Sequence, residues 1–471
     1  MPSSHSPSFW SGFITWILAF LKGSRPTPTP TGPEPRRKWT FMVYLAGDNN
    51  LEAAARKDLT EMKSVGSTDQ VNIVAQFDGM HDQGTRRYHI RRQGSLDDDV
   101  VARLPEVNTG DPAALRDFVL WAHQRYAAER YALILWNHGT GWKDEDIYYG
   151  LRKRGIRPDE LTRGQMRSLT SGNSSRSLFR SSIETLAVET VQKGRAILFD
   201  DTSADFLDNV EMKQVLEQAA EQIGRKIDLL GCDACLMSML EVAYQLRTSC
   251  SCFVASQEEE PGDGWPYDGV LRRLVDNPDM SPRLLAATIV EEYNNFYRNQ
   301  FPNLPVTQSA MDLEHLDPLA QGIDALADVL RAALEADWQK GNALISLALY
   351  DVQKFTDRDY VDLAHFCELL AEQNPRTAIA DAAQRLIELL QQSGDDSIII
   401  AEGHSGPGMR HVTGASIYLP QHILSPLYMR LLMTQEHRWD EFLHIKLDTH
   451  QRSARKTFRP GGPDDRTPKR R

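Results

Sequence analysis

Two short segments join the pattern of a buried strand to a residue able to do nucleophilic or acid–base chemistry. Residues 133–142 read LILWNHGTGW, and residues 227–237 read IDLLGCDACLM. In each segment an apolar run typical of a buried parallel strand ends close to a reactive side chain, His138 in the first and Cys235 in the second. A thiolate is a nucleophile and an imidazole accepts or delivers a proton, so the pair indicates acyl transfer.

These two residues need a scaffold that brings distant strand ends together. Open parallel sheets gather their chemistry at the carboxyl ends of the strands, so His138 and Cys235 are expected to meet at one such edge. A helical apolar pattern also starts at Cys235 and runs through residues 236–246. The positive end of that helix is expected to lower the pKa of the Cys235 thiol.

Two backbone N–H groups are candidate donors to an oxyanion, those of Cys235 and Gly139. Gly139 directly follows the histidine, and a residue without Cβ lets the backbone come close to a substrate.

The surrounding chain alternates strand and helix patterns. Strand-like runs occur at residues 40–46, 71–77, 88–92, 131–136, 196–199, 226–230 and 252–256. Helices fit between them, one with Asp111 as N-cap and Pro112 in its first turn, ending near Tyr126. The alternation predicts an α/β fold with a mainly parallel sheet covered by helices on both faces.

At these residues the chain resembles the clostripain family of cysteine peptidases, relatives of caspases and gingipains. The resemblance also includes WTFMVYLAGDNNLE at 39–52, NTGDP at 108–112, EVAY at 241–244, ASQEEEPGDGWPY at 255–267 and GASIYLP at 414–420. It spans roughly residues 39 to 420 in the expected order. A caspase-like architecture is what the resemblance implies.

Carried over by position, the resemblance implies that His138 is the catalytic acid or base and that Cys235 is the nucleophile. The family cleaves after Arg or Lys, and its pocket acids fall on Asp233 and Asp263. Carboxylates suit a cationic side chain, because its charge must be matched when it leaves water. Two plainer roles stay open: Asp233 as a helix N-cap and Asp263 as a turn residue before Gly264.

Residues 151–193 interrupt the alternation and predict a flexible surface insert. The segment is rich in Arg, Ser, Thr and Gly and has little apolar periodicity. Family members tend to be cut between the catalytic His and Cys during self-activation, which makes Arg167, Arg176, Arg180 and Lys193 candidate processing sites. An ordinary solvated linker is the alternative.

The five cysteines raise a rival hypothesis, a zinc or redox site. Cys232 and Cys235 form a C-x-x-C, and Cys250 with Cys252 forms a C-x-C. If the segment between the pairs is one helix, it holds them about 20 Å apart, too far for one zinc ion. We therefore predict no metal site here and interpret Cys232, Cys250, Cys252 and Cys367 as reduced structural thiols.

Composition fits a globular enzyme. The 471 residues are 41% apolar and 25% charged, with a net charge of −12. That charge argues against general nucleic-acid binding and favours the approach of cationic peptide or protein substrates. Calcium dependence is a trait of clostripain that the resemblance brings with it, but the sequence contains no EF-hand loop and assigns no ligands.

The two ends of the chain are expected to lie outside the catalytic domain, residues 39–280. Residues 1–38 contain an apolar run at 9–21, too short to cross a bilayer comfortably, and a Pro/Thr-rich linker at 25–35. The run suits an interfacial membrane anchor or a docking strand, so a secreted, membrane-associated or cytoplasmic location stays open.

The C-terminal part, residues 281–450, is predicted to be mainly helical. Helical spacing occurs at 317–336, 362–372 and 376–392, with late strands at 397–401 and 414–419 that are expected to extend or buttress the main sheet. Residues 451–471 are predicted to form a basic disordered tail.

Two functions compete with peptidase activity. One is a catalytically silent module that binds basic peptides, and the other is a thiol hydrolase acting on a non-peptide acyl group. Intact His138 and Cys235 argue against the first. The acids Asp233 and Asp263 argue against the second, because they favour a cation.

Overall fold

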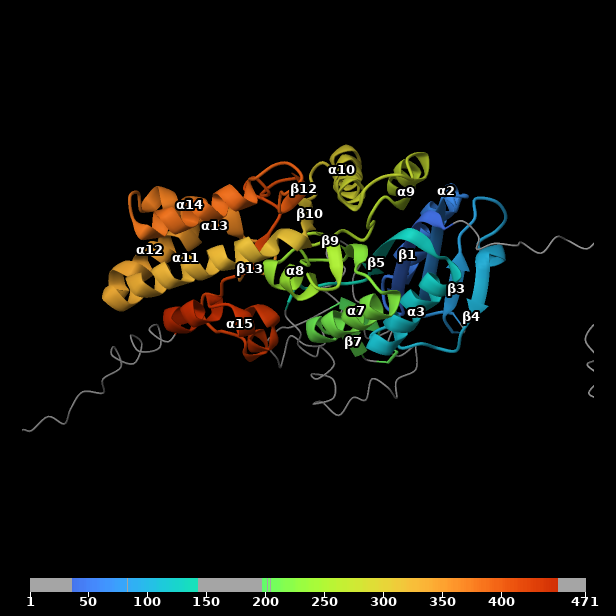
Figure 1. Ribbon diagram of the computed structural model, residues 1–471, viewed down its shortest axis with the longest axis horizontal. Coiled ribbons are helices and arrows are strands. Elements are labelled where there is room, and N and C mark those ends of the chain that lie inside the picture. The colour runs from blue at the N-terminus through green and yellow to red at the C-terminus, as the bar shows by residue number, and fades with distance from the viewer. Residues whose placement is uncertain (1–35, 83, 143–196, 201, 204, 448–471) are drawn as a thin grey trace, which may run out of the picture. The chain divides into compact units, whose positions relative to one another are not determined.

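The computed structural model describes residues 36–82, 84–142, 197–200, 202–203 and 205–447 (Figure 1). Within these residues the main sheet has nine strands in the order β12-β10-β9-β8-β5-β1-β2-β3-β4. Their bounds are β1 Arg37–Gly47, β2 Val71–Gly79, β3 Arg86–His89, β4 Val100–Arg103, β5 Ala128–Trp136, β8 Ile227–Asp233, β9 Cys250–Ala255, β10 Val306–Asp312 and β12 Ile399–Ser405.

The centre of this sheet is parallel and its edges are antiparallel. Strands β2, β1, β5, β8 and β9 pair in parallel. The antiparallel pairs are β2 with β3, β3 with β4, β9 with β10, and β10 with β12. The predicted mainly parallel sheet is therefore confirmed.

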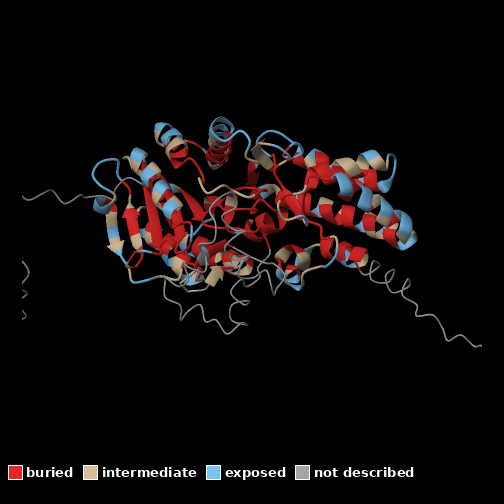
Figure 2. Ribbon diagram, turned by 180° about the vertical axis from the view of Figure 1, so that it is seen from behind, coloured by how far each residue is buried: buried red, intermediate tan, exposed pale blue. Residues whose placement is uncertain are grey.

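Alternate residues of β1 face two different helical layers, which accounts for its unbroken apolar character. Met42, Tyr44 and Ala46 share a core with helices α3 Pro112–Arg125, α7 Asn209–Ile223 and α8 Leu240–Leu246. Phe41, Val43 and Leu45 share a second core with α2 Glu52–Val65, α9 Tyr267–Asp276 and α10 Pro282–Gln300. Both faces of the sheet are covered, and Figure 2 shows buried residues in the central strands and on one side of many of the helices.

Helix α3 begins as its sequence predicts. The Asp111 side chain caps it by accepting a hydrogen bond from the Ala113 N–H, Pro112 occupies the first turn, and Tyr126 follows its last residue.

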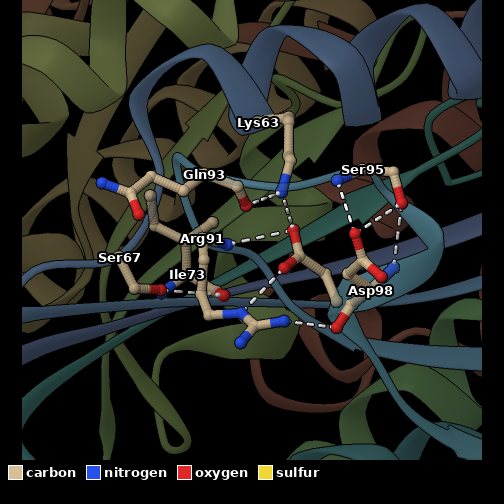
Figure 3. Close-up of polar contacts among 8 residues, drawn as sticks. Lys63, Ser67, Ile73, Arg91, Gln93, Ser95 and Asp98 are labelled. Carbon is tan, nitrogen blue, oxygen red and sulfur yellow. Dashed lines mark hydrogen bonds and ion pairs between the residues drawn. The ribbon is translucent and has the colours of Figure 1, made fainter.

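The far end of α2 is attached to the sheet by a buried acid, Asp99. Lys63 on α2 binds one carboxylate oxygen at 2.5 Å, and the Arg91 Nε binds the other at 2.9 Å. Figure 3 shows Lys63 and Arg91 converging from α2 and from the segment after β3. Two cations therefore match this buried charge and link α2 to the segment after β3.

The chain beyond residue 280 adds both sheet strands and a helical layer. Helices α11 Leu316–Ala336, α12 Trp338–Asp351, α13 Leu363–Gln373 and α14 Ala378–Leu390 contribute to the same core as α8. Strands β10 and β12 complete one edge of the main sheet. The chain from Arg37 onward thus forms one unit.

The remaining elements are short. Two small sheets pair β6 Ile197–Asp200 with β7 Asp205–Leu207, and β11 Tyr360–Asp362 with β13 Ser416–Tyr418. The other pieces are helix α15 Leu432–Glu436 and the 3-10 turns η1 Asp97–Asp99, η3 Leu313–His315 and η4 Pro426–Arg430. The two late strands therefore separate: β12 joins the main sheet, whereas β13 pairs with β11.

Several sequence predictions fall outside the described residues. These are the apolar run at 9–21, the linker at 25–35, the tail at 451–471 and the candidate processing residues Arg167, Arg176, Arg180 and Lys193. Among the helices that the structure does describe, none is long and apolar enough to cross a membrane.

Candidate active site

Neighbouring parallel strands bring His138 and Cys235 to the same edge of the sheet. Strands β5 and β8 pair directly, and the last pair in their register is Trp136 with Asp233. His138 and Cys235 each come two residues after that pair. The Asn137 N–H continues the pairing by donating to the Asp233 carbonyl at 3.3 Å. The register of β5 and β8 therefore places His138 and Cys235 at the same level beyond the ends of two neighbouring strands.

Both side chains line one small pocket, about 50 Å³ in volume. His138 is 5% exposed and Cys235 is 8% exposed. The lining residues come from the ends of β5 and β8, from the segment after β1 and from the loop after β9: Leu51, Trp136, Asn137, His138, Asp233, Ala234, Cys235, Glu259, Glu260, Pro261, Gly262 and Gly264.

The Cys235 thiol lies against the main chain of Glu260. The Glu260 N–H donates a hydrogen bond to the Cys235 Sγ at 3.2 Å, and the Sγ lies 3.7 Å from the Glu260 carbonyl oxygen as a donor. Burial raises the pKa of the Cys235 thiol, and the negative charge of Glu259 raises it further, while the Glu260 N–H acts in the opposite direction. The resting thiol is therefore protonated at neutral pH.

The predicted helix starting at Cys235 is wrong. Helix α8 begins only at Leu240. Leu236 has a left-handed backbone with φ of 64°, which a helix does not accept, and Met239 forms a bridge with Ser416 of β13. Residues 236–239 are all buried in the connection between β8 and α8. With no helix end at Cys235, the expected dipole effect on its pKa is absent.

The left-handed residue directly after the thiol is the sharpest local feature of the site. A branched or bulky side chain rarely adopts positive φ, so surrounding contacts must hold Leu236 there. Its N–H donates to the Glu258 carbonyl at 3.1 Å. At this turn the chain leaves the direction of β8, and the Cys235 side chain faces the pocket.

Asn50 is a neighbour of His138 that sequence reasoning missed. The Asn50 Oδ1 lies 2.9 Å from the His138 Nε2. Asn50 follows β1, so it lies at the same carboxyl edge as the other site residues. The polar run after an apolar strand, Asp48 to Asn50, was a usable signal for it.

Gly139 packs directly on the backbone of the candidate nucleophile. A Cβ at this position would lie 2.6 Å from the Cys235 carbonyl oxygen and 3.1 Å from the Cys235 nitrogen. Only glycine fits there without displacing main chain. The two predicted oxyanion donors, Gly139 and Cys235, thus belong to segments in close contact.

Asp233 forms part of a cluster of acids with Asp58 of α2, which is also buried, and with Glu260, which is half-buried but has a buried Oε2 atom. Its Oδ2 accepts hydrogen bonds from the Tyr267 hydroxyl at 2.9 Å and from the Trp265 N–H at 3.3 Å. Both Asp58 and Asp233 lie 3.3 Å from where a Cβ on Gly264 would be. We call Asp58, Asp233 and Glu260 the buried acid cluster.

Burial raises the pKa of all three carboxyl groups, and their mutual repulsion adds to the effect for Asp58 and Glu260. The pKa of Asp58 rises to about 9, and that of Glu260 lies well above its usual value. The Trp136 Nε1 donates to the Asp58 carboxyl at 2.7 Å, and the Gln308 Nε2 donates to Glu260 at 3.0 Å. Carboxyl groups with raised pKa values favour a nearby cation, because a positive charge would offset the mutual repulsion of their ionised forms.

Asp58 and Glu260 were not predicted. Asp58 is an acid on the face of α2 that also buries Ala55, Leu59 and Met62, which is a visible irregularity in the helical pattern. Glu260 is one of three consecutive acids after β9, and only the loop geometry distinguishes it from its neighbours.

Asp263, the second predicted pocket acid, does not line this pocket. Its carboxylate is 42% exposed and pairs with Lys57 at 2.9 Å. It lies in a turn closed by the Gly264 N–H on the Pro261 carbonyl at 3.0 Å, with Gly264 in the left-handed region. Asp233 is likewise no helix N-cap, since it ends β8.

The cysteines form no disulfide, and all five are buried. The argument that a long helix separates Cys232 from Cys250 and Cys252 is wrong, because β8 and β9 are paired strands and α8 spans only Leu240–Leu246. Among the described residues, the one group with the spacing of metal ligands is Asp48, Asp78 and Asp200, which contains no cysteine.

Comparison with known proteins identifies the family. The profile of the clostripain family matches residues 43–169 and 185–446. Clostripain from Hathewaya histolytica is 24% identical over 465 residues, covering 85% of this chain and 78% of the relative.

Solved structures show the same fold. A secreted C11 cysteine protease from Bacteroides thetaiotaomicron, in complex with an irreversible peptide inhibitor, aligns with a TM-score of 0.56 at 19% identity, covering 86% of this chain and 99% of that chain. An inactive zymogen C11 protease from Parabacteroides distasonis aligns with a TM-score of 0.56 at 18% identity and the same coverage. The caspase-like α/β fold is thereby confirmed. The chain belongs to the clostripain family and is a cysteine-type peptidase.

Proposed function

We propose that this peptidase cleaves peptide bonds after Arg or Lys, with Cys235 as the nucleophile and His138 as the proton carrier. One observation carries the proposal: His138 and Cys235 line a single pocket whose other walls include two acids, Asp233, which is buried, and Glu260, which is half-buried. A thiol and an imidazole supply the chemistry, and the acids supply a reason for a cationic side chain to bind beside them.

In the acylation step the Cys235 thiol transfers its proton to His138 as the sulfur attacks the substrate carbonyl carbon. A C–S bond forms, and the carbonyl electron pair moves onto oxygen. Collapse of this intermediate breaks the C–N bond, and His138 returns the proton to the leaving amine. The raised pKa of the Cys235 thiol fits this sequence of steps, since the thiol would then lose its proton to His138 only when substrate is bound.

In the deacylation step water attacks the thioester. His138 accepts a proton from the water as a C–O bond forms, the C–S bond then breaks with its electron pair going to sulfur, and His138 returns the proton to the sulfur to restore the thiol. Asn50, at 2.9 Å from the His138 Nε2, would orient the ring through both steps.

The N–H groups of Gly139 and Cys235 are the proposed oxyanion donors. The close packing of Gly139 on Cys235 supports this role, because it brings the backbones of the two residues next to each other. Donors held by a rigid main chain cost no reorganisation during the reaction.

The buried acid cluster would bind the Arg or Lys side chain. Binding a guanidinium or ammonium group would lower the raised pKa values of Asp58 and Glu260 and release protons. Asp263 remains a proposed contributor at the outer side, where Lys57 now neutralises it.

We further propose that the protein is cut in its 151–193 insert by its own activity, at Arg167, Arg176, Arg180 or Lys193. The support is the basic-residue specificity proposed above and the likeness to a protein described as an inactive zymogen. Full activity in a variant with all four residues changed to Ala, uncut by intact mass, would contradict this maturation step.

The first test compares wild type with Cys235→Ala on peptidyl reporters that end in Arg, Lys or a neutral residue. We expect turnover of the Arg and Lys reporters by wild type alone. Binding of basic peptides without turnover would instead favour a silent binding module. Turnover of simple thioesters or esters but no peptides would favour a thiol hydrolase.

A further inference from the structure

A second and larger pocket adjoins the pocket of His138 and Cys235. It is about 480 Å³ in volume, and its walls come from the end of α12, from residues 352–358, from residues 408–411 and from Glu258. We call it the second pocket. Glu258 lines this pocket, and the next residue in the chain, Glu259, lines the pocket of the thiol. The two pockets therefore meet at two consecutive residues of the loop after β9.

Glu258 also connects the second pocket to the turn after the thiol. Its carbonyl oxygen accepts a hydrogen bond at 3.1 Å from the N–H of Leu236, which directly follows Cys235. Its carboxylate accepts from the Thr356 N–H at 3.1 Å and from the Glu259 N–H at 2.9 Å. Hydrogen bonds thus link the wall of the second pocket to the residue beside the nucleophile.

The hairpin that carries this wall is attached to the histidine segment as well. Residues 354–361 form a tight hairpin whose first and last residues are joined by a bridge. The Tyr360 hydroxyl donates to the Thr140 carbonyl at 2.8 Å, two residues after His138. The hairpin therefore contacts the main chain beyond both reactive residues, which fixes the second pocket relative to the site of cleavage.

Positive charge gathers in the second pocket, where Lys354, Arg358 and His411 lie on the walls. Burial lowers the pKa of Lys354, and the charge of Arg358 lowers it further. The Lys354 ammonium donates to two main-chain carbonyls in the last turn of α12. Arg358 is exposed and has no hydrogen-bond or ion-pair partner among the described residues. An anion would relieve the repulsion between these two cations.

The two acids of the second pocket leave the Arg358 guanidinium available. Asp351 is the last residue of α12 and is exposed, so water screens its charge. Glu258 is buried, and main-chain N–H groups already donate to its carboxylate. Burial raises the pKa of Glu258, which favours its neutral form. Arg358 is therefore free to bind an acidic group that arrives from outside.

A stacked pair of imidazoles supports His411 on the pocket wall. The rings of His365 and His411 lie 4.2 Å apart between centroids, with 13° between their planes. The His365 Nδ1 accepts from the Gln353 N–H at 2.9 Å. Burial lowers the pKa of His365 to about 4, and His411 lowers it further, so His365 is neutral at neutral pH. His411 thus lies on a fixed ring and offers the pocket a hydrogen-bond donor.

We propose that the second pocket is a substrate subsite that binds an acidic side chain, Glu or Asp, of the peptide being cleaved. The Arg358 guanidinium would hold the carboxylate through two parallel N–H donors. An extended peptide advances about 3.3 Å per residue, so the acid would lie about two to four residues from the cleaved bond. The assignment rests on the proposed cleavage after Arg or Lys, to which it adds a requirement for the opposite charge nearby.

The test uses internally quenched peptides with a single Arg at the cleaved bond and only Ser and Gly elsewhere. Glu or Gln is placed in turn at each of the four positions on either side. At one position, kcat/KM is expected to be about tenfold higher for Glu than for Gln. A general effect of the net charge of −12 would act in the opposite direction, against the acidic peptide.

Variants of Arg358 assign the preference to the pocket. Arg358→Gln should bring the ratio of kcat/KM for Glu over Gln close to one, and Arg358→Lys should keep part of it because the charge remains. Arg385→Gln is the matched control, since it removes an exposed charge from α14, outside the pocket, and should keep the wild-type ratio.

Equal rates for Glu and Gln at every position, with cleavage after Arg intact, would overturn the subsite and leave the proposed function standing. An unchanged Glu preference in Arg358→Gln would also overturn it. Fluorescence anisotropy of the labelled peptides on Cys235→Ala measures binding without turnover. Tighter binding of the Glu peptide that depends on Arg358, in a protein whose native Cys235 form has no turnover, would support the subsite and contradict the proposed peptidase function.

Discussion

The Glu260 N–H donates a hydrogen bond to the Cys235 Sγ across 3.2 Å. This contact ties the loop after β9 to the thiol and partly offsets the effect of burial on its pKa. Burial prevails and raises the pKa of the thiol, so we expect a neutral thiol in the free enzyme.

Alkylation of Cys235 should therefore be slow in the free enzyme. Iodoacetamide should modify it at least about tenfold more slowly at pH 8 than an unstructured cysteine peptide, with a rate still rising above pH 9. Peptide mass mapping follows Cys235 against the four other buried cysteines in the same sample. Rapid alkylation at pH 6 would show a thiolate–imidazolium pair and contradict this prediction.

Asn50→Ala should lower kcat about 10- to 100-fold with little change in KM, because a misoriented imidazole impairs proton transfer but not peptide binding. Asn50 is exposed, so the melting temperature should change little. Asn50→Asp keeps an acceptor for the His138 Nε2 and should restore part of the rate, with the acidic limb of the pH–rate profile shifted upward. Equal loss in both variants would exclude an orienting role.

Asp233→Asn should reduce the preference for Arg over citrulline, its neutral isostere, by about 30-fold or more. The reason is the loss of a buried negative charge while acceptors for Tyr267 and Trp265 remain. Asp263→Asn serves as the comparison and should change the same ratio less than about fivefold, because that carboxylate is half exposed and paired with Lys57. A larger effect at Asp263 would assign the specificity to the outer acid.

Asp58→Asn should make the protein more resistant to alkaline pH. The folded pKa of Asp58 is about 9 against 3.8 in a model peptide, so the folded state holds a proton that the unfolded state releases. Stability from this group is full below about pH 4 and is lost as pH rises toward 9, by up to about 1.4 kcal/mol per pH unit. Asn cannot lose that proton and still accepts from Trp136.

The measurement is the melting temperature of the Cys235→Ala background between pH 6 and 9, with and without Asp58→Asn. Asp276→Asn, on the exposed side of α9, is the control for a lost surface charge. Parallel pH curves for all three proteins would show that Asp58 ionises normally.

Gly139→Ala should lower kcat/KM by at least about 100-fold. The added Cβ would lie 2.6 Å from the Cys235 carbonyl oxygen, so the main chain beside the thiol must shift. Gly269→Ala in α9 is the matched control, because its Cβ meets only side-chain atoms at the far end of Glu292 and no main chain. Wild-type activity in Gly139→Ala would exclude both the close packing and the oxyanion role.

The strands that end at the site could be predicted, because they are identified by the apolar pattern of their own residues. Unbroken apolar runs identify parallel strands buried on both faces, and parallel strands deliver their ends to one edge. Those two rules suffice to bring His138 and Cys235 together, since β5 and β8 are neighbours. The start of α3 could be predicted for the same reason, since its N-cap and first-turn proline are neighbours in the sequence.

The features that were predicted wrongly or missed depend on contacts between residues distant in sequence. Leu236 is left-handed because β13 and the loop at Glu258 hold the residues after Cys235, and no pattern within 236–246 records this. Strand β10 was missed because its polar residues, Thr307, Gln308 and Ser309, are buried against loops and neighbouring strands. Asp58 joins Asp233 only through the packing of α2 on the sheet.

The pairing of β5 with β8 has a further consequence for a cut polypeptide. The 151–193 insert lies between these strands in sequence, but main-chain hydrogen bonds hold them together from Ala132 and Leu229 to Trp136 and Asp233. A break in the insert would divide the chain and leave the sheet whole. The fragment that carries His138 and the fragment that carries Cys235 would then stay associated and would separate only in denaturant. The cut enzyme would be a heterodimer encoded by a single gene.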